Sequence, residues 1–366
     1  MPESDRPRSA HRRRRLSRKG KVVAALATVT VVAGAALGYF TLFPKQAPAF
    51  VQKTLVSVGL ADPNEVEPQA VCPLTGEVVP SGRVPTRPAL AVKVENHPEA
   101  RPQSGLNSAD IVYEEPVEGG ITRFIAVYHC GNEARVGPVR SARMADPHVL
   151  SQFGVPIFAF SGGAPHVERK VSSSELVPLD ETAGGSAFVR DPGRAAPHDL
   201  YTGTRPLYRL AKAGRVPPSP VFGYTAEVEN PSRRSGGIHL RFSSTYADVF
   251  WTWSRRDRAW VRAHGSELHL AEDGEAVSAD NVIVQVIATA SDPSGGPTPI
   301  LSLTGTGRAY VFRDGRVILG RWERDSLRDV TRFVTKSGDE IMLAPGRTWV
   351  ELTPNSVVPE VMPPAG

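Results

Sequence analysis

The usual signatures of catalysis are missing from this chain. There is no GxSxG turn to present a serine nucleophile, no GxxxxGK[ST] loop for phosphates and no HExxH helix for zinc. Only two cysteines occur among the 366 residues, and neither lies in a recognisable nucleophile context. These absences argue against an ordinary hydrolase and leave room only for a less common kind of site.

A net positive charge is absent once the amino terminus is set aside. Residues 1–21 hold nine Arg and Lys against two acidic residues, a net charge of +7, whereas the whole chain carries +5. The residues after this tail therefore carry a net charge of −2. Because a nucleic-acid-binding domain needs a basic surface, we expect no nucleic-acid partner.

Charged residues are absent altogether from residues 22–43. As a helix this stretch would be about 33 Å long, enough to cross a bilayer core of about 30 Å. The preceding basic cluster predicts residues 1–21 as a cytoplasmic tail, with the bulk of the chain outside the cytoplasm. The stretch is longer than the apolar core of most cleavable signal peptides, which favours a transmembrane signal-anchor in a single-pass protein of the cell membrane. Cleavage near Ala47-Pro48-Ala49 is the alternative.

Both cysteines, Cys72 and Cys130, follow the apolar stretch, beyond a proline-containing segment at 44–71 that we interpret as a stalk. In the oxidising space outside the cytoplasm a pair of cysteines is more often bonded than free. We therefore expect a Cys72–Cys130 disulfide, with two unrelated buried thiols as the alternative.

The folded portion is expected to be α+β, since 33 prolines and 33 glycines indicate many turns and little long helix. Residues 72–214 mix short strand and helix patterns and predict an α/β first domain with a central sheet. After a proline-rich boundary, residues 221–354 show mostly short strands and predict a mainly-β second domain. Residues 355–366 are expected to be a flexible tail.

Three strand predictions in the first domain are specific. Alternation of apolar and polar residues predicts a half-buried strand over 90–95. Two strand patterns separated by PVEGG predict a hairpin over 109–130. The continuous apolar run at 155–160 predicts a strand covered on both faces.

A candidate anion site follows from two nearby segments. The motif GPVRSAR places Arg140 and Arg143 three residues apart, and two guanidinium groups this close suit a phosphate or a carboxylate. The same pair could instead bridge to carboxylates of its own domain. Downstream, a buried strand ends in Ser161-Gly162-Gly163 before a helix, where backbone N–H groups could face an anion, unless the segment is only a tight turn.

Acidic residues and histidines offer a weaker set of candidates. Asp110 and Glu114 would share one face of a strand, where they could hold Mg²⁺, act as acid and base, or neutralise nearby arginines. His97, His166 and His198 lie in loops without ligand spacing, so the sequence predicts no metal site.

Long motifs give the sequence a family resemblance. It is carried by RPALAVKVENHPEARPQSGLNSADIVYEEPVEGGITRFIAVY, GPVRSAR, SGGAP and PHDLYT, and later by NVIVQ, GRAYVFRDGR, GRWERDS and LAPGRTWVEL. On these motifs the chain resembles the two-domain YerB-like family of bacterial lipoproteins, from about Cys72 to Pro354. That family has no known function, so the resemblance implies architecture and an envelope location. Members are often lipid-anchored through a cysteine just after the signal, and here the first cysteine is Cys72.

The order of strand, hairpin, arginine segment and Gly-Gly is also similar to LytR–CpsA–Psr-type enzymes, which transfer glycopolymers from polyprenyl-pyrophosphate carriers to the cell wall. Two main hypotheses follow. In the first, a membrane-tethered module without a cofactor binds an anionic envelope ligand or a protein partner. In the second, an envelope transferase or hydrolase clamps a phosphate-linked substrate with Arg140 and Arg143, while Asp110 or Glu114 holds Mg²⁺ or acts as base. A purely structural scaffold is a third possibility.

Overall fold

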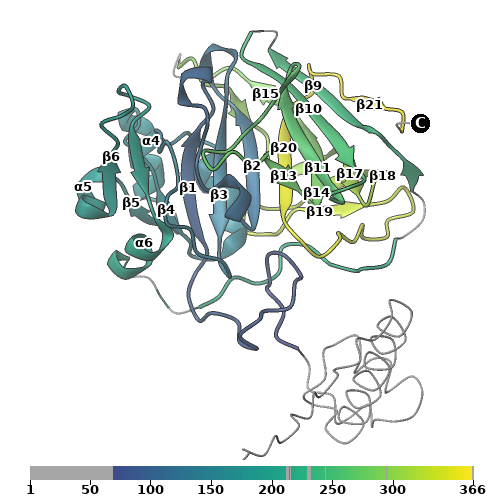
Figure 1. Ribbon diagram of the computed structural model, residues 1–366, viewed down its shortest axis with the longest axis horizontal. Helices are drawn as coiled ribbons and strands as arrows, with labels where there is room; N and C mark the ends of the chain where they lie inside the picture. Colours follow the sequence, from purple (N-terminus) through teal and green to yellow (C-terminus); the bar gives the residue numbers. More distant parts are fainter. Residues whose placement is uncertain are drawn as a thin grey trace, which may run out of the picture. The chain divides into compact units, whose positions relative to one another are not determined.

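The computed structural model describes residues 69–364, apart from 212–213, 215, 229–231, 244 and 293–295. The predicted tail, the signal-anchor and nearly all of the stalk therefore lie outside the described residues. Residues 70–366 form one compact unit (Figure 1). Among the described residues, no helix is long and apolar enough to cross a membrane.

One large sheet contains strands from both halves of this unit. Its strands are β1 (Leu90–Glu95), β2 (Ile111–Pro116), β3 (Thr122–Tyr128), β4 (Ile157–Ala159), β5 (Val177–Leu179), β8 (Arg233–Arg234), β14 (Asn281–Ile287), β17 (Gly305–Arg313), β18 (Arg316–Arg324), β19 (Arg332–Val334) and β20 (Thr348–Pro354). They follow the order β19-β18-β17-β14-β20-β2-β3-β1-β4-β5, with β8 paired to β18. Because β20 pairs in parallel with β2, the segments 72–214 and 221–354 are joined through the middle of one sheet.

A second sheet is built from the later part of the chain. It contains β9 (Gly237–Ser243), β10 (Ala247–Ser254), β11 (Ala259–His264), β12 (Glu267–Leu268), β13 (Ser278–Ala279) and β21 (Glu360–Met362). Two small pairs are β6 (Phe188–Arg190) with β7 (Leu200–Thr202), and β15 (Thr289–Ala290) with β16 (Ile300–Leu301). In the segment expected to be a flexible tail, β21 instead pairs with β9.

Helices are few and short. The α-helices are α3 (Asp146–Leu150), α4 (Pro165–Ser172), α5 (Glu181–Gly184) and α6 (Thr204–Leu210). Single 3₁₀ turns are η2 (Pro98–Ala100), η3 (Leu106–Ser108), η4 (Glu118–Gly120), η5 (Ser151–Phe153) and η6 (Gly185–Ala187). The expected mixture of sheets with few helices is confirmed.

Both faces of the large sheet are covered. One face packs with Val149 of α3 and Val167 of α4. The other packs with Trp251 and Trp260 of the second sheet and Leu207 of α6. The hairpin β2–β3 and the buried strand β4 are confirmed, with β2 and β3 antiparallel and β4 parallel to β1.

The strand over 90–95 differs from its prediction, because all six residues are buried. Its polar face lies inside the molecule, where Lys93 forms ion pairs with Glu115 and Asp146. A buried ammonium group persists only when it is paired, and the sequence pattern of β1 does not show these partners.

The expected disulfide is confirmed. Cys72 and Cys130 are bonded, with their Cα atoms 6.1 Å apart. The bond fastens the start of the folded portion to the segment that follows β3.

Candidate ligand site

A row of charged side chains crosses the ends of three neighbouring strands. Glu95 of β1 lies opposite Arg123 of β3, and Arg123 lies opposite Glu115 of β2. Residues opposite one another in a sheet share a face, and all three side chains are buried. The predicted arginine segment contacts this row, since Arg140 pairs with Glu95 and Arg123 donates to the Ser141 carbonyl.

The two predicted segments are held together by their backbones. The Ser161 N–H donates to the Arg140 carbonyl at 2.9 Å, and the Ala142 N–H donates to the Gly162 carbonyl at 3.0 Å. Gly162 has a φ of +62°, a backbone conformation that suits glycine. The segment is therefore also the tight turn that the sequence offered as the alternative. The structure thus places the arginine segment beside the Ser-Gly-Gly turn.

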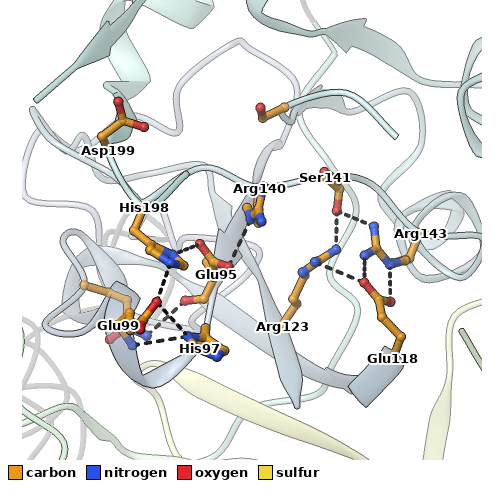
Figure 2. A network of polar contacts seen from close by, with 12 residues as sticks. Glu95, His97, Glu99, Glu118, Arg123, Arg140, Ser141, Arg143, His198 and Asp199 are labelled. Carbon is orange, nitrogen blue, oxygen red and sulfur yellow. Dashed lines mark hydrogen bonds and ion pairs between the residues drawn. The ribbon is translucent and has the colours of Figure 1, made fainter. Parts of the chain in front are cut away.

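Arg143 is engaged by Glu118 on η4 (Figure 2). Its Nε donates to Glu118 Oε2 at 2.8 Å and its Nη2 donates to Oε1. Arg123 Nη2 lies 3.3 Å from the same Oε1, so two guanidinium groups share one carboxylate. Burial alone would raise the pKa of Glu118, but the hydrogen bond from Arg143 and the two arginine charges lower it to about 2. Burial, followed by the Arg143 charge, lowers the pKa of Arg123 to about 10.

A cleft of about 320 Å³ opens beside this pair. Arg143 and Glu118 line it together with Gly163, Ala164 and His166, which lie at the start of α4. The N–H groups of these last three residues donate to no other group among the described residues. The cleft therefore has unused backbone donors at the positive end of a helix. They lie beside Arg143, whose Nε and Nη2 donate to Glu118 and whose Nη1 donates to the Ser141 and Ala142 carbonyls.

Arg140 lies next to this cleft but its guanidinium group is used elsewhere. Its Nε donates to Glu95 Oε1 at 2.9 Å. The other carboxylate oxygen of Glu95 lies 2.9 Å from His198 Nδ1. Arg140 is thus held in an internal ion pair, the alternative that the sequence left open.

Two histidines that the sequence did not connect lie side by side. The rings of His97 and His198 stack with centroids 5.6 Å apart. Glu99 Oε2 lies 3.1 Å from His198 Nε2 and 3.9 Å from His97 Nδ1 (Figure 2). Because the two histidines are about a hundred residues apart in the chain, no ligand spacing could have indicated them. The third histidine, His166, lies apart from them, 3.8 Å from Asp292.

Asp110 is not brought to the arginine segment. Its Oδ2 accepts hydrogen bonds from the backbone N–H groups of His129 at 2.5 Å and Cys130 at 3.2 Å. Burial raises the pKa of Asp110 to about 6, even though these two bonds oppose the shift. The carboxyl group holds the backbone beside the disulfide.

Glu114 also lies away from the cleft. It forms a fully buried ion pair with Arg262, at 2.7 Å. Glu114 and Val112 lie on the same face of β2, the face that packs against the second sheet. Ala142, in the arginine segment, packs on the opposite face of the large sheet. The carboxylate that neutralises Arg143 and Arg123 is Glu118, and neither Asp110 nor Glu114 has that position.

Two family profiles match the chain. The one described as "Protein of unknown function (DUF3048) N-terminal domain" matches residues 74–216, and the corresponding C-terminal domain matches residues 238–350. Together they span well over half of the chain. The protein belongs to the DUF3048 family.

A relative from Bacillus subtilis (strain 168) bears the name "Putative lipoprotein YerB". It is 29% identical over 292 residues, which cover 77% of this chain and 86% of that protein. A crystal structure of the YerB protein from Bacillus subtilis superposes with a TM-score of 0.70 at 25% identity, over 80% of this chain and 100% of that chain. The resemblance to the YerB-like family is thereby confirmed.

Proposed function

We propose that this protein is held in the cell envelope, outside the cytoplasm, and binds an anionic ligand in the cleft beside Arg143. The observation that carries the proposal is the sharing of Glu118 by two guanidinium groups next to unused backbone donors. An anion in the cleft would displace Glu118 from Arg143 and accept charge-assisted hydrogen bonds in its place, with further bonds from the N–H groups of Gly163 and Ala164.

We favour ligand binding without catalysis because of where the candidate catalytic carboxylates, Asp110 and Glu114, lie. A transferase or hydrolase acting on a phosphate-linked substrate would need a base or a metal-binding carboxylate at the phosphate. Asp110 and Glu114 are engaged elsewhere, by backbone N–H groups and by Arg262 respectively. Asp110 and Glu114, the two carboxylates to which the enzymatic alternative gave this role, therefore do not support it.

The location rests on the disulfide and on the relative. A structural disulfide is typical of proteins outside the cytoplasm, and YerB is named as a lipoprotein. A lipid anchor on cysteine needs a free thiol, whereas Cys72 is bonded to Cys130. This favours the transmembrane signal-anchor at residues 22–43. A reporter enzyme fused after residue 366 should be active outside the cytoplasm, and activity only inside would contradict this topology.

The binding proposal is tested by titrating the full chain, purified in detergent, with inorganic pyrophosphate. Arg143→Ala should weaken binding by roughly 10–100-fold, because a charge-assisted hydrogen bond contributes about 1.5–3 kcal/mol. The matched control is Arg328→Ala, which removes a surface arginine paired with Glu175. Arg328→Ala should leave binding unchanged.

A second variant separates binding from internal packing. Glu118→Gln removes the carboxylate that competes with an incoming anion for Arg123 and Arg143, so pyrophosphate affinity should rise by about tenfold. If the arginines serve only Glu118, this variant will lose thermal stability and the wild type will bind no pyrophosphate. That result would overturn the proposal.

A further inference from the structure

We propose that His97, Glu99 and His198 bind a divalent transition-metal ion, with Zn²⁺ as the first candidate. This site is separate from the proposed anion cleft. Each residue offers one ligand atom, and the three atoms all lie within 4.8 Å of one another. Two imidazoles and one carboxylate form a ligand set that suits zinc, whereas Mg²⁺ and Ca²⁺ prefer ligands that are all oxygen.

The distances are close to those that a tetrahedral ion requires. With bonds of about 2.0–2.2 Å to nitrogen and oxygen, ligand atoms around such an ion stand roughly 3.3–3.6 Å apart. Glu99 Oε2 lies 3.1 Å from His198 Nε2 and 3.9 Å from His97 Nδ1. The Glu99 side chain is 72% exposed and can adjust by this small amount.

The segments that carry the ligands are fixed by local structure. His97 is the N-cap of η2 and Glu99 lies in its first turn. His97 Nδ1 accepts a hydrogen bond from the Glu99 N–H at 3.3 Å, and a metal ion bound at Nδ1 would replace that bond. His198 precedes β7 and is almost buried, with 12% of its side chain exposed. Two short loops thus present three ligands from a rigid base.

A carboxylate behind His198 orients its ring. Glu95 Oε2 lies 2.9 Å from His198 Nδ1, and only 3% of the Glu95 side chain is exposed. If Nδ1–H donates to Glu95, Nε2 is left as the metal-binding atom. This is the carboxylate–histidine arrangement found behind many metal ligands. Glu95 is itself held by Arg140, whose Nε donates to the other oxygen.

The alternative to a metal site is that His198 simply forms ion pairs with its two neighbouring glutamates, and this explains less of the observed arrangement. A histidine bridging Glu95 and Glu99 would account for His198 alone. It gives no reason for His97 to stack on His198 with an interplanar angle of 10° beside the same Glu99 oxygen. Three protein ligands would leave a fourth coordination position for water or a ligand, as in open zinc sites.

The test uses the full chain in detergent, stripped of metal with a chelator and titrated with Co²⁺ as a spectroscopic probe. We expect visible absorption typical of four-coordinate Co²⁺ that saturates at one equivalent and disappears when Zn²⁺ is added. Glu99→Gln and His198→Ala should each weaken binding by at least about 100-fold, since even outer-shell changes cost 10–100-fold.

The controls match the ligands in type and exposure. His148→Ala changes a histidine outside the cluster, and Glu175→Gln changes a carboxylate that is 65% exposed. Both should bind Co²⁺ as the wild type does. Because Glu99 is on the surface, loss of binding in Glu99→Gln with unchanged thermal unfolding cannot arise from misfolding. A wild-type spectrum like that of aqueous Co²⁺, or equal affinities for wild type and ligand variants, would overturn the proposal.

Discussion

Glu114 accepts two hydrogen bonds from Arg262 Nη2, at 2.8 and 2.7 Å, although the two residues are 148 positions apart in the chain. Both side chains are fully buried, one on β2 of the large sheet and the other on β11 of the second sheet. Burial, and then the charge of Glu114, raise the pKa of neighbouring Glu351 well above its ordinary range. With Glu351 neutral, one carboxylate charge faces one guanidinium charge.

Removing one partner of this pair should be costly. We expect Glu114→Gln to lower the free energy of unfolding by about 3–5 kcal/mol, because Arg262 would stay buried without its counter-charge. Chemical denaturation of the full chain would measure the change, with the exposed Glu340→Gln as a control expected to have little effect. The double variant Glu114→Leu with Arg262→Met should recover part of the loss. If Glu114→Gln leaves the free energy of unfolding unchanged, the ion pair does not hold the two sheets together.

The disulfide should stabilise the fold chiefly by restricting the unfolded chain. It closes a loop of 58 residues, for which the chain-entropy model gives about 4 kcal/mol. Cys72→Ser with Cys130→Ser should therefore unfold at a lower denaturant concentration by a corresponding amount. Thiol labelling of denatured, unreduced wild type should detect neither cysteine, and full labelling of both would show that the bond does not form.

Asp110 should make stability fall as pH rises. Its pKa in the folded protein is about 6, above the ordinary value of 3.8, so the folded state holds a proton that the unfolded state has lost. Its contribution is present below pH 3.8 and is lost as pH rises through 6, a change of about 3 kcal/mol. Asp110→Asn keeps an oxygen for the N–H groups of His129 and Cys130 and should remove this pH dependence. Equal pH slopes for wild type and variant would disprove it.

Arg140 should affect the proposed metal more than the proposed anion. Because it positions Glu95 behind His198, Arg140→Gln should weaken Co²⁺ binding by about 10–100-fold and alter the cobalt spectrum. Pyrophosphate affinity should change little, since the guanidinium group lies on Glu95. The reverse outcome, with pyrophosphate lost and Co²⁺ retained, would place Arg140 in the anion site.

The sequence determined the features that depend on neighbouring residues. Alternating and continuous apolar runs predicted the β2–β3 hairpin and the buried β4, because side-chain periodicity reflects which faces are covered. Asp314-Gly315 forms the turn between β17 and β18, where both residues adopt the positive φ that a tight hairpin needs and that this residue pair tolerates. The position and number of the cysteines were enough to predict their bond.

Only the tertiary structure decided which polar groups meet. Lys93 lies in the strand predicted to be half-buried, and Glu114 was a candidate acid or metal ligand, yet each is buried in an ion pair with a residue of another element. The partners of Lys93 lie on β2 and α3, and the partner of Glu114 lies on the second sheet. A local pattern contains no information on which strands and helices lie together. The pairing of His97 with His198 arises in the same way. The amino-acid type fixes the chemistry of a side chain, but its charge partner and burial are set by tertiary contacts, here between residues from 22 to 148 positions apart.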